Sequence, residues 1–252
     1  MGSVIITGAS SGIGRACAGI FAQNRYNLIV NARRVDRLER LAKDLEDYGV
    51  RIFFQKVDMR NNDEVLTFIR SIPEDLKPVD VLINNAGLSR GLEPLDTGSI
   101  DDWHEMIDTN IKGVLYITRA VIPMMKSQGF GHIINIGSIA GLEPYPGGNI
   151  YCATKAAIKS LNKSLRMDLI RTNIRVTGID PGMVETEFSE VRFRDRQKAK
   201  KVYEKLKPLT AHDIADVIYF CATRPAHVDI EELVIMPTQQ ASVLINDRDY
   251  RK

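Results

Sequence analysis

Hydrophobic residues along this chain occur in short runs that alternate with longer segments of mixed polarity. In the longer segments, apolar residues recur at the spacing of one helix face. We expect strands over Ser3–Thr7, Asn27–Asn31, Arg51–Val57, Val79–Asn85, His132–Gly137, Asn173–Ile179 and Glu232–Met236. These runs are almost continuously apolar, which is typical of parallel strands that helices cover on both faces.

The longer segments predict helices between the strands, over about 12–23, 35–48, 62–72, 100–128, 150–172 and 211–223. Strands and helices that alternate at this spacing indicate parallel strands joined by crossover helices. We therefore expect 1–252 to form a single-domain α/β doubly wound Rossmann fold, with about seven parallel strands flanked by helices on both faces.

Two segments depart from the alternation. The polar stretch 185–207 is rich in Arg and Lys, and its length and charge predict a lid-like excursion at the surface. The tail 237–252 lacks both helical and strand periodicity, so we expect it to fray or to lie across a neighbouring subunit.

Composition and charge narrow the class of protein. With 44% hydrophobic and 26% charged residues, the chain has the composition of a folded globular protein. Its 34 basic and 32 acidic residues leave a net charge of +2, which favours neither nucleic acid nor an anionic membrane as a partner. No apolar stretch approaches the roughly 20 residues that a membrane-spanning helix needs. The partner we expect is a small molecule.

Cysteine and histidine give no sign of a metal site or a disulfide framework. Cys17, Cys152 and Cys221 are an odd number without CxxC spacing, which fits a reducing cytoplasm. The four histidines are scattered and form no local ligand pattern. We therefore expect no metal and a cytoplasmic location.

The segment TGASSGIG (Thr7–Gly14) joins the first predicted strand to the first predicted helix. At such a junction, a tight turn brings backbone N–H groups close to a pyrophosphate at the helix N-terminus. Gly8, Gly12 and Gly14 give the turn its freedom, although their spacing departs from the usual Gly-x-Gly-x-x-Gly. The motif predicts a dinucleotide site, while a plain tight turn would use the same glycines.

The residues after the second predicted strand indicate which dinucleotide binds. Sites for NAD place an Asp or Glu there, whose carboxylate accepts a hydrogen bond from the ribose 2′-hydroxyl. This chain has Ala32, Arg33 and Arg34 instead. A guanidinium forms charge-assisted hydrogen bonds with a 2′-phosphate, so we predict NADP(H) rather than NAD(H). The alternative is a solvated Arg pair that opens the next helix.

Polar residues also follow the third and fourth predicted strands. Asp58 comes after the third, and Asn85, Ala86 and Gly87 come after the fourth. Because ligands of open α/β sheets bind at the carboxyl ends of the strands, these residues are candidates to surround the adenine and its ribose. Asn85 and Gly87 are equally suited to forming a turn.

The candidate reaction centre is the pair Tyr151 and Lys155, which lie four residues apart on one face of a predicted helix. A free tyrosine has a pKa of about 10 and is a poor acid or base near neutrality. We expect the Lys155 ammonium to lower that pKa, so that Tyr151 exchanges a proton with a substrate carbonyl. Ser138, at the end of a predicted strand, can donate to the same oxygen. Without companion motifs, such a pair is usually an ordinary surface pair.

The companion motifs make this chain resemble the short-chain dehydrogenase/reductase family. The resemblance rests on TGASSGIG, the NNAG run at 84–87, Asn110, Ser138 and the YxxxK motif at 151–155, in the family's order and at its intervals. It implies a seven-stranded doubly wound sheet and an oxidoreductase without a metal. It also implies assembly as a tetramer or dimer, of which we expect the homotetramer.

The resemblance also assigns site residues. It implies a proton relay of Asn110 and water with Lys155, which also binds the nicotinamide ribose. It assigns Pro181, Gly182 and Val184 to the nicotinamide end of the site. The alternative is that Pro181-Gly182 only forms a turn. Thr186 falls near the carboxamide or phosphates. The residues expected to contact NADP(H) are Gly8, Ser10, Ser11, Gly12, Ile13, Gly14, Arg33, Arg34, Asp58, Met59, Asn85, Ala86, Gly87, Tyr151, Lys155, Pro181, Gly182, Val184 and Thr186.

Further segments, among them TEFSEVRF at 186–193, resemble the 3-hydroxy acid or serine dehydrogenase branch of the family. Its members act on short acids such as serine, 3-hydroxyisobutyrate and malonic semialdehyde, and a related type reduces sulfoacetaldehyde. A small acid needs a cationic end to its pocket, for which Arg192 is the main candidate and Arg90 a further one. The expected substrate contacts are Ser138, Tyr145, Asn149, Tyr151 and Arg192.

Three classes of function remain open at this point. The leading class interconverts a short hydroxy acid, of the serine, 3-hydroxypropionate or 3-hydroxyisobutyrate type, and its carbonyl form. The enzymatic rivals are a sulfoacetaldehyde reductase, a broad carbonyl reductase and a ketoacyl-carrier-protein reductase. The third class is a non-catalytic NADP(H)-binding regulator, which would have little need for Ser138, Tyr151 and Lys155 together.

Overall fold

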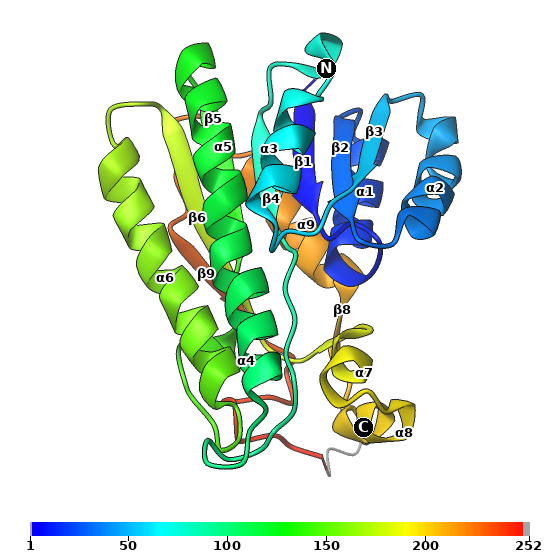
Figure 1. Cartoon of the computed structure of the whole chain (residues 1–252), viewed down its shortest axis with the longest axis vertical. Coiled ribbons are helices and arrows are strands. Elements are labelled where there is room, and N and C mark those ends of the chain that lie inside the picture. The colour runs from blue at the N-terminus through cyan, green and yellow to red at the C-terminus, as the bar shows by residue number, and fades with distance from the viewer. Residues whose placement is uncertain (1, 249–252) are drawn as a thin grey trace.

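The computed structural model describes residues 2–248, and its centre is one parallel sheet. The seven strands lie in the order β3-β2-β1-β4-β5-β6-β9, the doubly wound arrangement that the sequence predicts. They are β1 (Ser3–Thr7), β2 (Asn27–Ala32), β3 (Ile52–Lys56), β4 (Val81–Asn84), β5 (Gly131–Ile136), β6 (Ile174–Pro181) and β9 (Glu232–Ile235). Because all of them run parallel, their carboxyl ends meet at one edge, the lower one in Figure 1.

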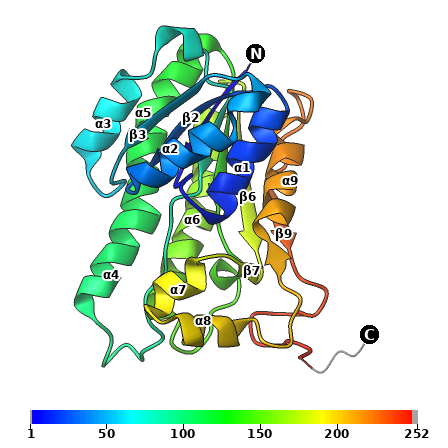
Figure 2. The same cartoon turned by 90° about the vertical axis from the view of Figure 1, so that its right-hand side faces the viewer.

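Helices cover both faces of the sheet, as Figures 1 and 2 show. One layer holds α1 (Gly12–Gln23), α2 (Val35–Asp44) and α9 (Ala211–Ala222). The other holds α3 (Asn62–Arg70), α5 (Gly113–Gln128) and α6 (Asn149–Leu169). Successive strand residues point to opposite faces, so Ile6 packs in the cluster of Phe21 and Ile5 in that of Phe68. Because both faces of the sheet are buried under helices, the strands have nearly continuous apolar sequences.

The expected helix over 100–128 changes its winding partway. α4 (Ile100–Ile107) leads into a π-helical stretch, Asp108–Lys112, after which α5 begins at Gly113. Such wide turns often occur at functional sites because they redirect a side chain. Here the stretch contains Asn110, which is buried.

The lid-like segment (185–207) contains regular structure. Its helices are α7 (Phe188–Phe193) and α8 (Arg196–Val202), and β7 (Val184–Glu185) pairs with β8 (Leu209–Thr210) in a small second sheet. Figures 1 and 2 both show α7 and α8 beyond the carboxyl edge of the main sheet. The segment therefore lies over the edge at which parallel sheets bind their ligands.

The tail packs against its own chain as far as residue 248. Gln240 is buried and accepts a hydrogen bond from the Met183 N–H at 2.8 Å. Arg248 donates to the carbonyl oxygens of Val202 and Glu204, at 3.1 and 2.8 Å, where α8 ends. These bonds tie the tail to Met183 and to the end of α8, which differs from the expected fraying. The alternative, that the tail lies across a neighbouring subunit, stays a prediction, and 249–252 lie outside the described residues.

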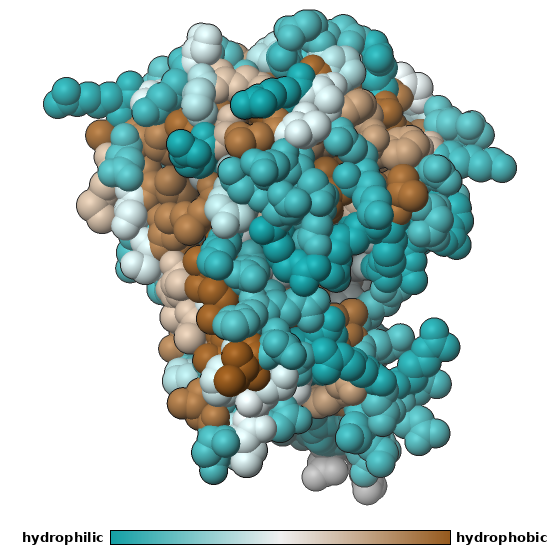
Figure 3. All heavy atoms as spheres, viewed as in Figure 1, coloured by the Kyte–Doolittle hydropathy of each residue, from teal (hydrophilic) through white to brown (hydrophobic). Residues whose placement is uncertain are grey.

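One side of the molecular surface is markedly apolar. Figure 3 shows hydrophobic residues gathered on the left over α5 and α6, whereas the region of α7 and α8 is mainly hydrophilic. Met167 of α6 is 70% exposed, and Ile170, just after this helix, is 80% exposed. Contiguous apolar surface of this kind marks a site of association. Within 2–248, no helix combines the length and apolar character that crossing a bilayer demands.

Candidate active site

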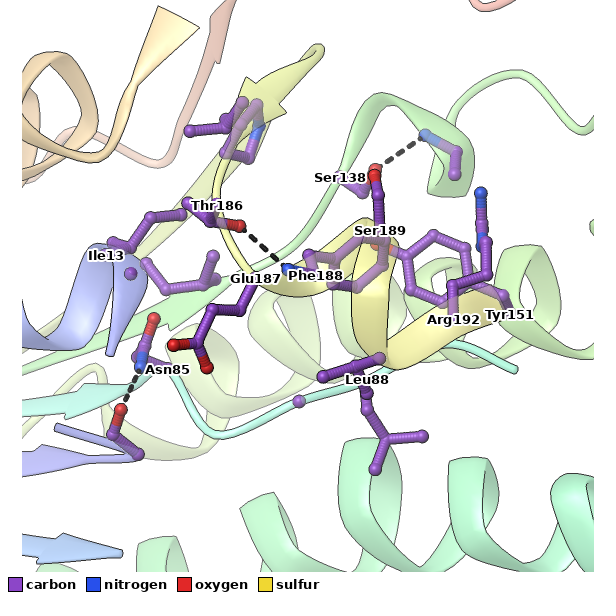
Figure 4. Close-up of a pocket in the computed structure, with 18 of the residues that line it drawn as sticks. Ile13, Asn85, Leu88, Ser138, Tyr151, Thr186, Glu187, Phe188, Ser189 and Arg192 are labelled. Atoms are coloured by element: carbon purple, nitrogen blue, oxygen red, sulfur yellow. Dashed lines mark hydrogen bonds between the residues drawn. The ribbon is translucent and has the colours of Figure 1, made fainter. Parts of the chain in front are cut away.

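A cavity of about 740 Å³ opens at the carboxyl edge of the sheet. Its walls come from the carboxyl ends of β1 to β6, from the lid-like segment and from the tail. Figure 4 shows Ile13, Asn85, Ser138, Tyr151 and Arg192 around it. Nearly all residues expected to contact NADP(H) or substrate line this cavity, and the exceptions are Gly14, Arg90 and Asn149. Asn110, expected in a proton relay, also lies outside the cavity wall.

The glycine turn closes one end of the cavity. Its conformation requires residues that have no Cβ atom. Gly8 and Gly12 have φ angles of +69° and +53°, in the left-handed region that glycine adopts without strain. α1 starts here with no side-chain cap, so its first N–H groups remain available to an anion. Gly14 is different, because a Cβ there would lie 2.5 Å from Asn85 Nδ2. Gly14 therefore allows close packing and does not line the cavity, and its assignment as a contact residue stays a prediction.

Asn85 lines the cavity and also holds the turn in place. Its Nδ2 donates to the carbonyl oxygens of Thr7 and Gly8, at 2.8 and 3.3 Å. The backbone N–H groups of Asn85 and Ala86 both donate to Thr7 Oγ1 at 3.0 Å. The turn-forming role that the sequence left open is therefore present, and it fixes β4 against β1 beneath the cavity.

Arg34 connects the glycine turn to the lid-like segment. Its Nη2 donates to Ser11 Oγ at 2.9 Å, and its Nη1 pairs with Glu187 at 2.9 Å. Arg37, one turn further along α2, pairs with the same carboxylate at 2.5 Å. Burial would raise the pKa of Glu187, but the hydrogen bonds from Arg37 and Arg34 hold it below its usual value. A cationic subsite of this kind suits a phosphate.

Arg33 and Asp58 complete that end of the cavity. The Arg33 guanidinium is half exposed and lies 3.5 Å from Glu105. Asp58 accepts hydrogen bonds from Arg60, which hold the pKa of the Asp58 carboxyl below its usual value. The site therefore offers an accessible cation in Arg33 and an ionised acceptor in Asp58 to a ligand with a phosphate and ribose hydroxyls.

Tyr151 and Lys155 meet Ser138 at the reaction end of the cavity. Both α6 residues are buried, with Lys155 Nζ 5.9 Å from the centre of the Tyr151 ring. Lys155 donates to the carbonyl oxygen of Ile136 at 2.8 Å, which anchors it to the end of β5. Ser138 follows that strand and hydrogen-bonds with the Tyr151 hydroxyl. The three groups that the sequence selected are therefore brought together.

The pKa values at the reaction end differ from the sequence expectation. Burial raises the pKa of Tyr151 above its usual value, and the Ser138 hydrogen bond and the Arg192 charge offset only part of the rise. Burial also lowers the pKa of Lys155 to about 8. The expectation that Lys155 lowers the pKa of Tyr151 is therefore wrong for this structure, because burial dominates and the cation that acts on the phenol is Arg192.

Asn110 supports the site from behind the cavity wall. Its Oδ1 accepts from the Leu88 N–H at 2.9 Å, and its Nδ2 donates to Leu88 O at 2.8 Å and Thr154 Oγ1 at 3.1 Å. Within 2–248 no direct hydrogen bond joins Asn110 to Lys155. These bonds tie the π-helical stretch to α6, and the relay of Asn110 with Lys155 stays a prediction.

Arg192 on α7 brings a cation to the reaction end. Its guanidinium lies 5.2 Å from the Tyr151 ring centre, 5.6 Å from that of Tyr145 and 5.4 Å from that of Phe188. It donates to Ser89 Oγ at 2.9 Å and to the Tyr145 hydroxyl. Figure 4 shows Arg192 beside Tyr151. No carboxylate within 2–248 pairs with this guanidinium, so it remains available to an anionic ligand.

Two other substrate candidates have different roles. Asn149 lies outside the cavity because its Oδ1 accepts from the Ile150 N–H at 2.7 Å and its Nδ2 donates to Glu93 O at 3.1 Å. The geometry therefore gives no support to its assignment as a substrate contact, which stays a prediction. Arg90 pairs with Glu105 at 2.7 Å and also donates to the carbonyl oxygen of Val191, so it supports α7 from outside.

The segment after β6 forms the roof of the cavity. The Gly182 N–H donates to Ile235 O at 2.8 Å, which extends the pairing of β6 with β9 past Pro181. Thr186 lies over the glycine turn, since a Cβ at Gly12 would be 3.4 Å from its side chain. Pro181, Gly182, Val184 and Thr186 all line the cavity, as the resemblance implies.

Several lining residues escaped the sequence analysis. They are Glu187, Phe188, Ser189, Tyr203, Gln240, Val243, Leu244 and Arg248. The segment TEFSEVRF marked the first three as belonging to a characteristic run without giving them roles. Nothing in the pattern of the tail indicated that it reaches the cavity. No three His, Cys, Asp or Glu side chains within 2–248 are grouped to hold a metal ion.

Comparison with known proteins places the chain among dehydrogenases. Residues 3–197 match the family described as short chain dehydrogenase. The NADP-dependent 3-hydroxy acid dehydrogenase of Salmonella typhimurium is 46% identical over 240 residues, or 94% of this chain and 96% of that protein. Sulfoacetaldehyde reductase 2 of Chromohalobacter salexigens is 45% identical over 249 residues, or 98% of each.

Solved structures give the same result. The closed form of a serine dehydrogenase complexed with NADP+ superposes with a TM-score of 0.93 at 42% identity, covering 99% of this chain and 100% of that one. An alcohol dehydrogenase from the archaeon Thermococcus sibiricus, complexed with 5-hydroxy-NADP, gives 0.85 at 31% identity, covering 95% and 98%. Proteins with NADP in their descriptions thus share both the sequence and the fold of this chain.

Proposed function

Because this chain belongs to the short-chain dehydrogenase/reductase family and is an NADP-dependent oxidoreductase, we propose that its substrates are short hydroxy acids and their carbonyl forms. Serine, 3-hydroxypropionate and 3-hydroxyisobutyrate represent the type. The relatives named as 3-hydroxy acid and serine dehydrogenases support this substrate class.

The observation that carries the proposal is the unpaired cation beside the reaction centre. Arg192 lies 5.2 Å from the Tyr151 ring and has no carboxylate partner within 2–248. A largely enclosed guanidinium is stabilised when an anion accepts two of its hydrogen bonds. The carboxylate of a short acid would supply that anion and leave the neighbouring carbon near Tyr151.

The cavity fits NADP(H) in shape and charge. The left-handed Gly8 and Gly12 bring the backbone close to where a pyrophosphate would lie, and Arg33 and Arg34 can hold the 2′-phosphate. Lys155 is placed to bind the nicotinamide ribose. When bound, NADP(H) supplies or accepts the hydride.

The side chains of this chain then handle the proton. In the direction of reduction, Tyr151 donates its phenolic proton to the substrate oxygen, and its raised pKa keeps that proton in place beforehand. Ser138 donates a hydrogen bond to the same oxygen and stabilises the charge that develops there. In the direction of oxidation, the Tyr151 phenolate takes the substrate proton, and the Arg192 charge and the Ser138 hydrogen bond favour that phenolate.

Replacing Arg192 tests the proposal. In Arg192→Ala we expect kcat/KM for serine, 3-hydroxypropionate and 3-hydroxyisobutyrate to fall by about 100-fold, because an ionic hydrogen-bonded contact is lost. Turnover of uncharged alcohols of similar size should stay within about threefold. Arg194→Ala is the matched control, because Arg194 is exposed and pairs with Asp102. Unchanged kcat/KM for every short acid would refute the substrate class.

A second candidate substrate is sulfoacetaldehyde. Its sulfonate is also an anion that Arg192 can hold, and a sulfoacetaldehyde reductase is 45% identical to this chain. The same panel, extended to sulfoacetaldehyde, simple ketones and acetoacetyl thioesters, ranks the candidates by kcat/KM. A preference for ketones would favour a broad carbonyl reductase, and a preference for thioesters would favour a ketoacyl-carrier-protein reductase. Tight NADPH binding without turnover of any compound would favour a regulator.

We also propose that the protein assembles as a homotetramer in the cytoplasm. The exposed apolar surface over α5 and α6 supports self-association, because such surface is rarely left in water. All three cysteines are free and buried, which suits a reducing compartment.

A further inference from the structure

Asp180 is a buried carboxyl group to which the proposed mechanism gives no role. It lies one residue before the end of β6 and is 5% exposed. Its Oδ1 accepts a hydrogen bond from the Ser138 N–H at 2.9 Å. A Cβ at Gly137 would overlap this oxygen, so the absence of a side chain at 137 lets the carboxyl reach the backbone of the reaction end. Asp180 thus fixes the loop that carries Ser138.

The other side of Asp180 faces a second carboxyl group. Glu232 on β9 pairs with Gly178, two residues before Asp180 on β6, so the two carboxyl groups point to the same face of neighbouring strands and interact there. Two carboxyl groups can share a hydrogen bond only if one of them carries a proton, so the pair holds one proton between them. Lys159 on α6 forms an ion pair with Glu232, which keeps the negative charge on Glu232 and the proton on Asp180. Burial and the contact with Glu232 raise the pKa of Asp180 to about 7.

Asp180 also acts on the buried cation of the reaction end. Lys155 donates to the carbonyl oxygen of Ile136 and Asp180 accepts from the Ser138 N–H, so both groups are anchored at the end of β5, two residues apart. Burial lowers the pKa of Lys155, and the Asp180 charge opposes this shift. The other charged groups around the pair are Lys159 and Lys163, both on α6. Ionisation of Asp180 therefore raises the pKa of the Lys155 ammonium.

We propose that Asp180 is a positioning residue whose carboxyl, sharing a proton with Glu232, fixes Ser138 and, once ionised, keeps Lys155 protonated. This inference rests on the proposed function for its kinetic consequences. Between neutrality and about pH 8, Asp180 ionises while Lys155 must keep its proton to bind the nicotinamide ribose. The pair thus extends the active range of the enzyme to higher pH.

The variant Asp180→Asn removes the ionisable group at this position and keeps the size of the side chain. The amide oxygen still accepts from the Ser138 N–H, but the side chain can no longer ionise. We expect kcat at pH 6.5 to stay within about threefold of the parent, because Ser138 remains in place. In the direction of reduction, the basic limb of kcat/KM should move by about one pH unit towards acid, because Lys155 loses its supporting charge. Tyr151 does not limit this limb, since burial raises its pKa.

Asp180→Ala removes the anchor as well. We expect kcat to fall at least about tenfold at every pH, with KM for NADPH unchanged, because Ser138 loses its fixed position. Asp229→Asn is the matched control, since Asp229 is a partly buried carboxylate in the segment before β9 that pairs with Arg166. Its pH profile should superimpose on that of the parent. A profile of Asp180→Asn that also superimposes on the parent would overturn the proposal, whether or not the alanine variant folds.

A measurement without substrate separates this proposal from the proposed function. A folded carboxyl with a raised pKa stabilises the protein at low pH, and this stabilisation is lost as the pH rises through the folded value. Relative to Asp180→Asn, the parent should therefore lose stability in urea unfolding between about pH 4 and pH 7. A constant difference between the two proteins over this range would overturn the shared proton, even if no short acid is a substrate.

Discussion

Tyr151 is a weak acid that its surroundings make weaker still. The ring packs 5.5 Å from that of Phe188, and burial outweighs the Ser138 hydrogen bond and the Arg192 charge in setting its pKa. A donor of this kind holds its proton until negative charge develops on the oxygen that it faces. The pocket therefore favours transfer in the transition state over early ionisation.

Tyr151→Phe tests that role directly. The ring and its packing stay, but the proton is gone, so we expect kcat to fall by about 1,000-fold. NADPH affinity, followed by nicotinamide fluorescence, should stay within about twofold because the cavity keeps its shape. A variant that binds NADPH normally and retains full turnover would disprove the mechanism.

Residue types were easier to predict than the direction in which side chains point. Ser138, Tyr151 and Lys155 reach one cavity because each sits at a strand end or on one helix face, which spacing specifies. Asn149 turns away because the end of its own helix offers a backbone partner. The pKa of Tyr151 was mispredicted for a related reason: burial is a property of the assembled fold and not of a pair of residues.

At the scale of elements, α7 is fastened at both ends to groups around the cofactor subsite. Before its start, Glu187 pairs with Arg34 and Arg37 on α2. At its end, Arg90 holds the carbonyl oxygen of Val191, and the Gly91 N–H donates to Arg192 O at 3.1 Å. The start of the helix that carries Arg192 is therefore positioned by Arg37 and by Arg34, and Arg34 is one of the two arginines proposed to hold a 2′-phosphate.

Glu187→Gln probes this connection. Removing the carboxylate frees two guanidinium groups for the 2′-phosphate and loosens α7, so we expect the Kd for NADPH to fall by about threefold to tenfold. KM for the acid substrate should rise by a similar factor, while the Kd for NADH stays the same. Fluorescence titration and steady-state kinetics measure these changes. Glu190→Gln, whose partner Arg196 is mainly exposed, is the control. Weaker NADPH binding would contradict the expectation.

The elements that the sequence predicted well are those with their own apolar periodicity. β1 and α1 begin and end at the expected residues, whereas α7 and α8 were missed. A six-residue helix such as α7 gains little from local propensity and depends on contacts with residues distant in the sequence. The π-helical stretch was missed for the same reason, since its bonds to Leu88 and Thr154 are not local.

At the scale of the whole molecule, the fold class and the preference for NADP(H) predicted from the sequence are confirmed. Strands that alternate with helices along the sequence predict a parallel sheet. The absence of an Asp or Glu after β2 predicts NADP(H) as the coenzyme. The contribution of the tail was not predictable, because Gln240 and Arg248 act through a few isolated hydrogen bonds that leave no periodic pattern in the sequence. The tail closes the cavity from the far side of the lid-like segment.

The apolar surface over α5 and α6 predicts how copies of the chain associate. In the double variant Met167→Glu/Ile170→Glu, we expect the assembly to dissociate to smaller species in sedimentation velocity, because charges replace exposed apolar side chains. Val35→Glu, on α2, is the control and should leave the size unchanged. A monomeric parent protein, or a double variant of unchanged size, would rule out this surface as the interface.

The position of Arg192 has a consequence for substrate length. Its guanidinium lies 5.2 Å from the centre of the Tyr151 ring and is held by Ser89 and Tyr145, while the Tyr151 ring packs against Phe188. A substrate that reaches both groups must separate its anion from its reacting carbon by only one or two bonds of carbon chain. Under the proposed function, Arg192 and Tyr151 together select acids by the distance between the carboxylate and the reacting carbon. The substituents on the carbons between these two groups can vary.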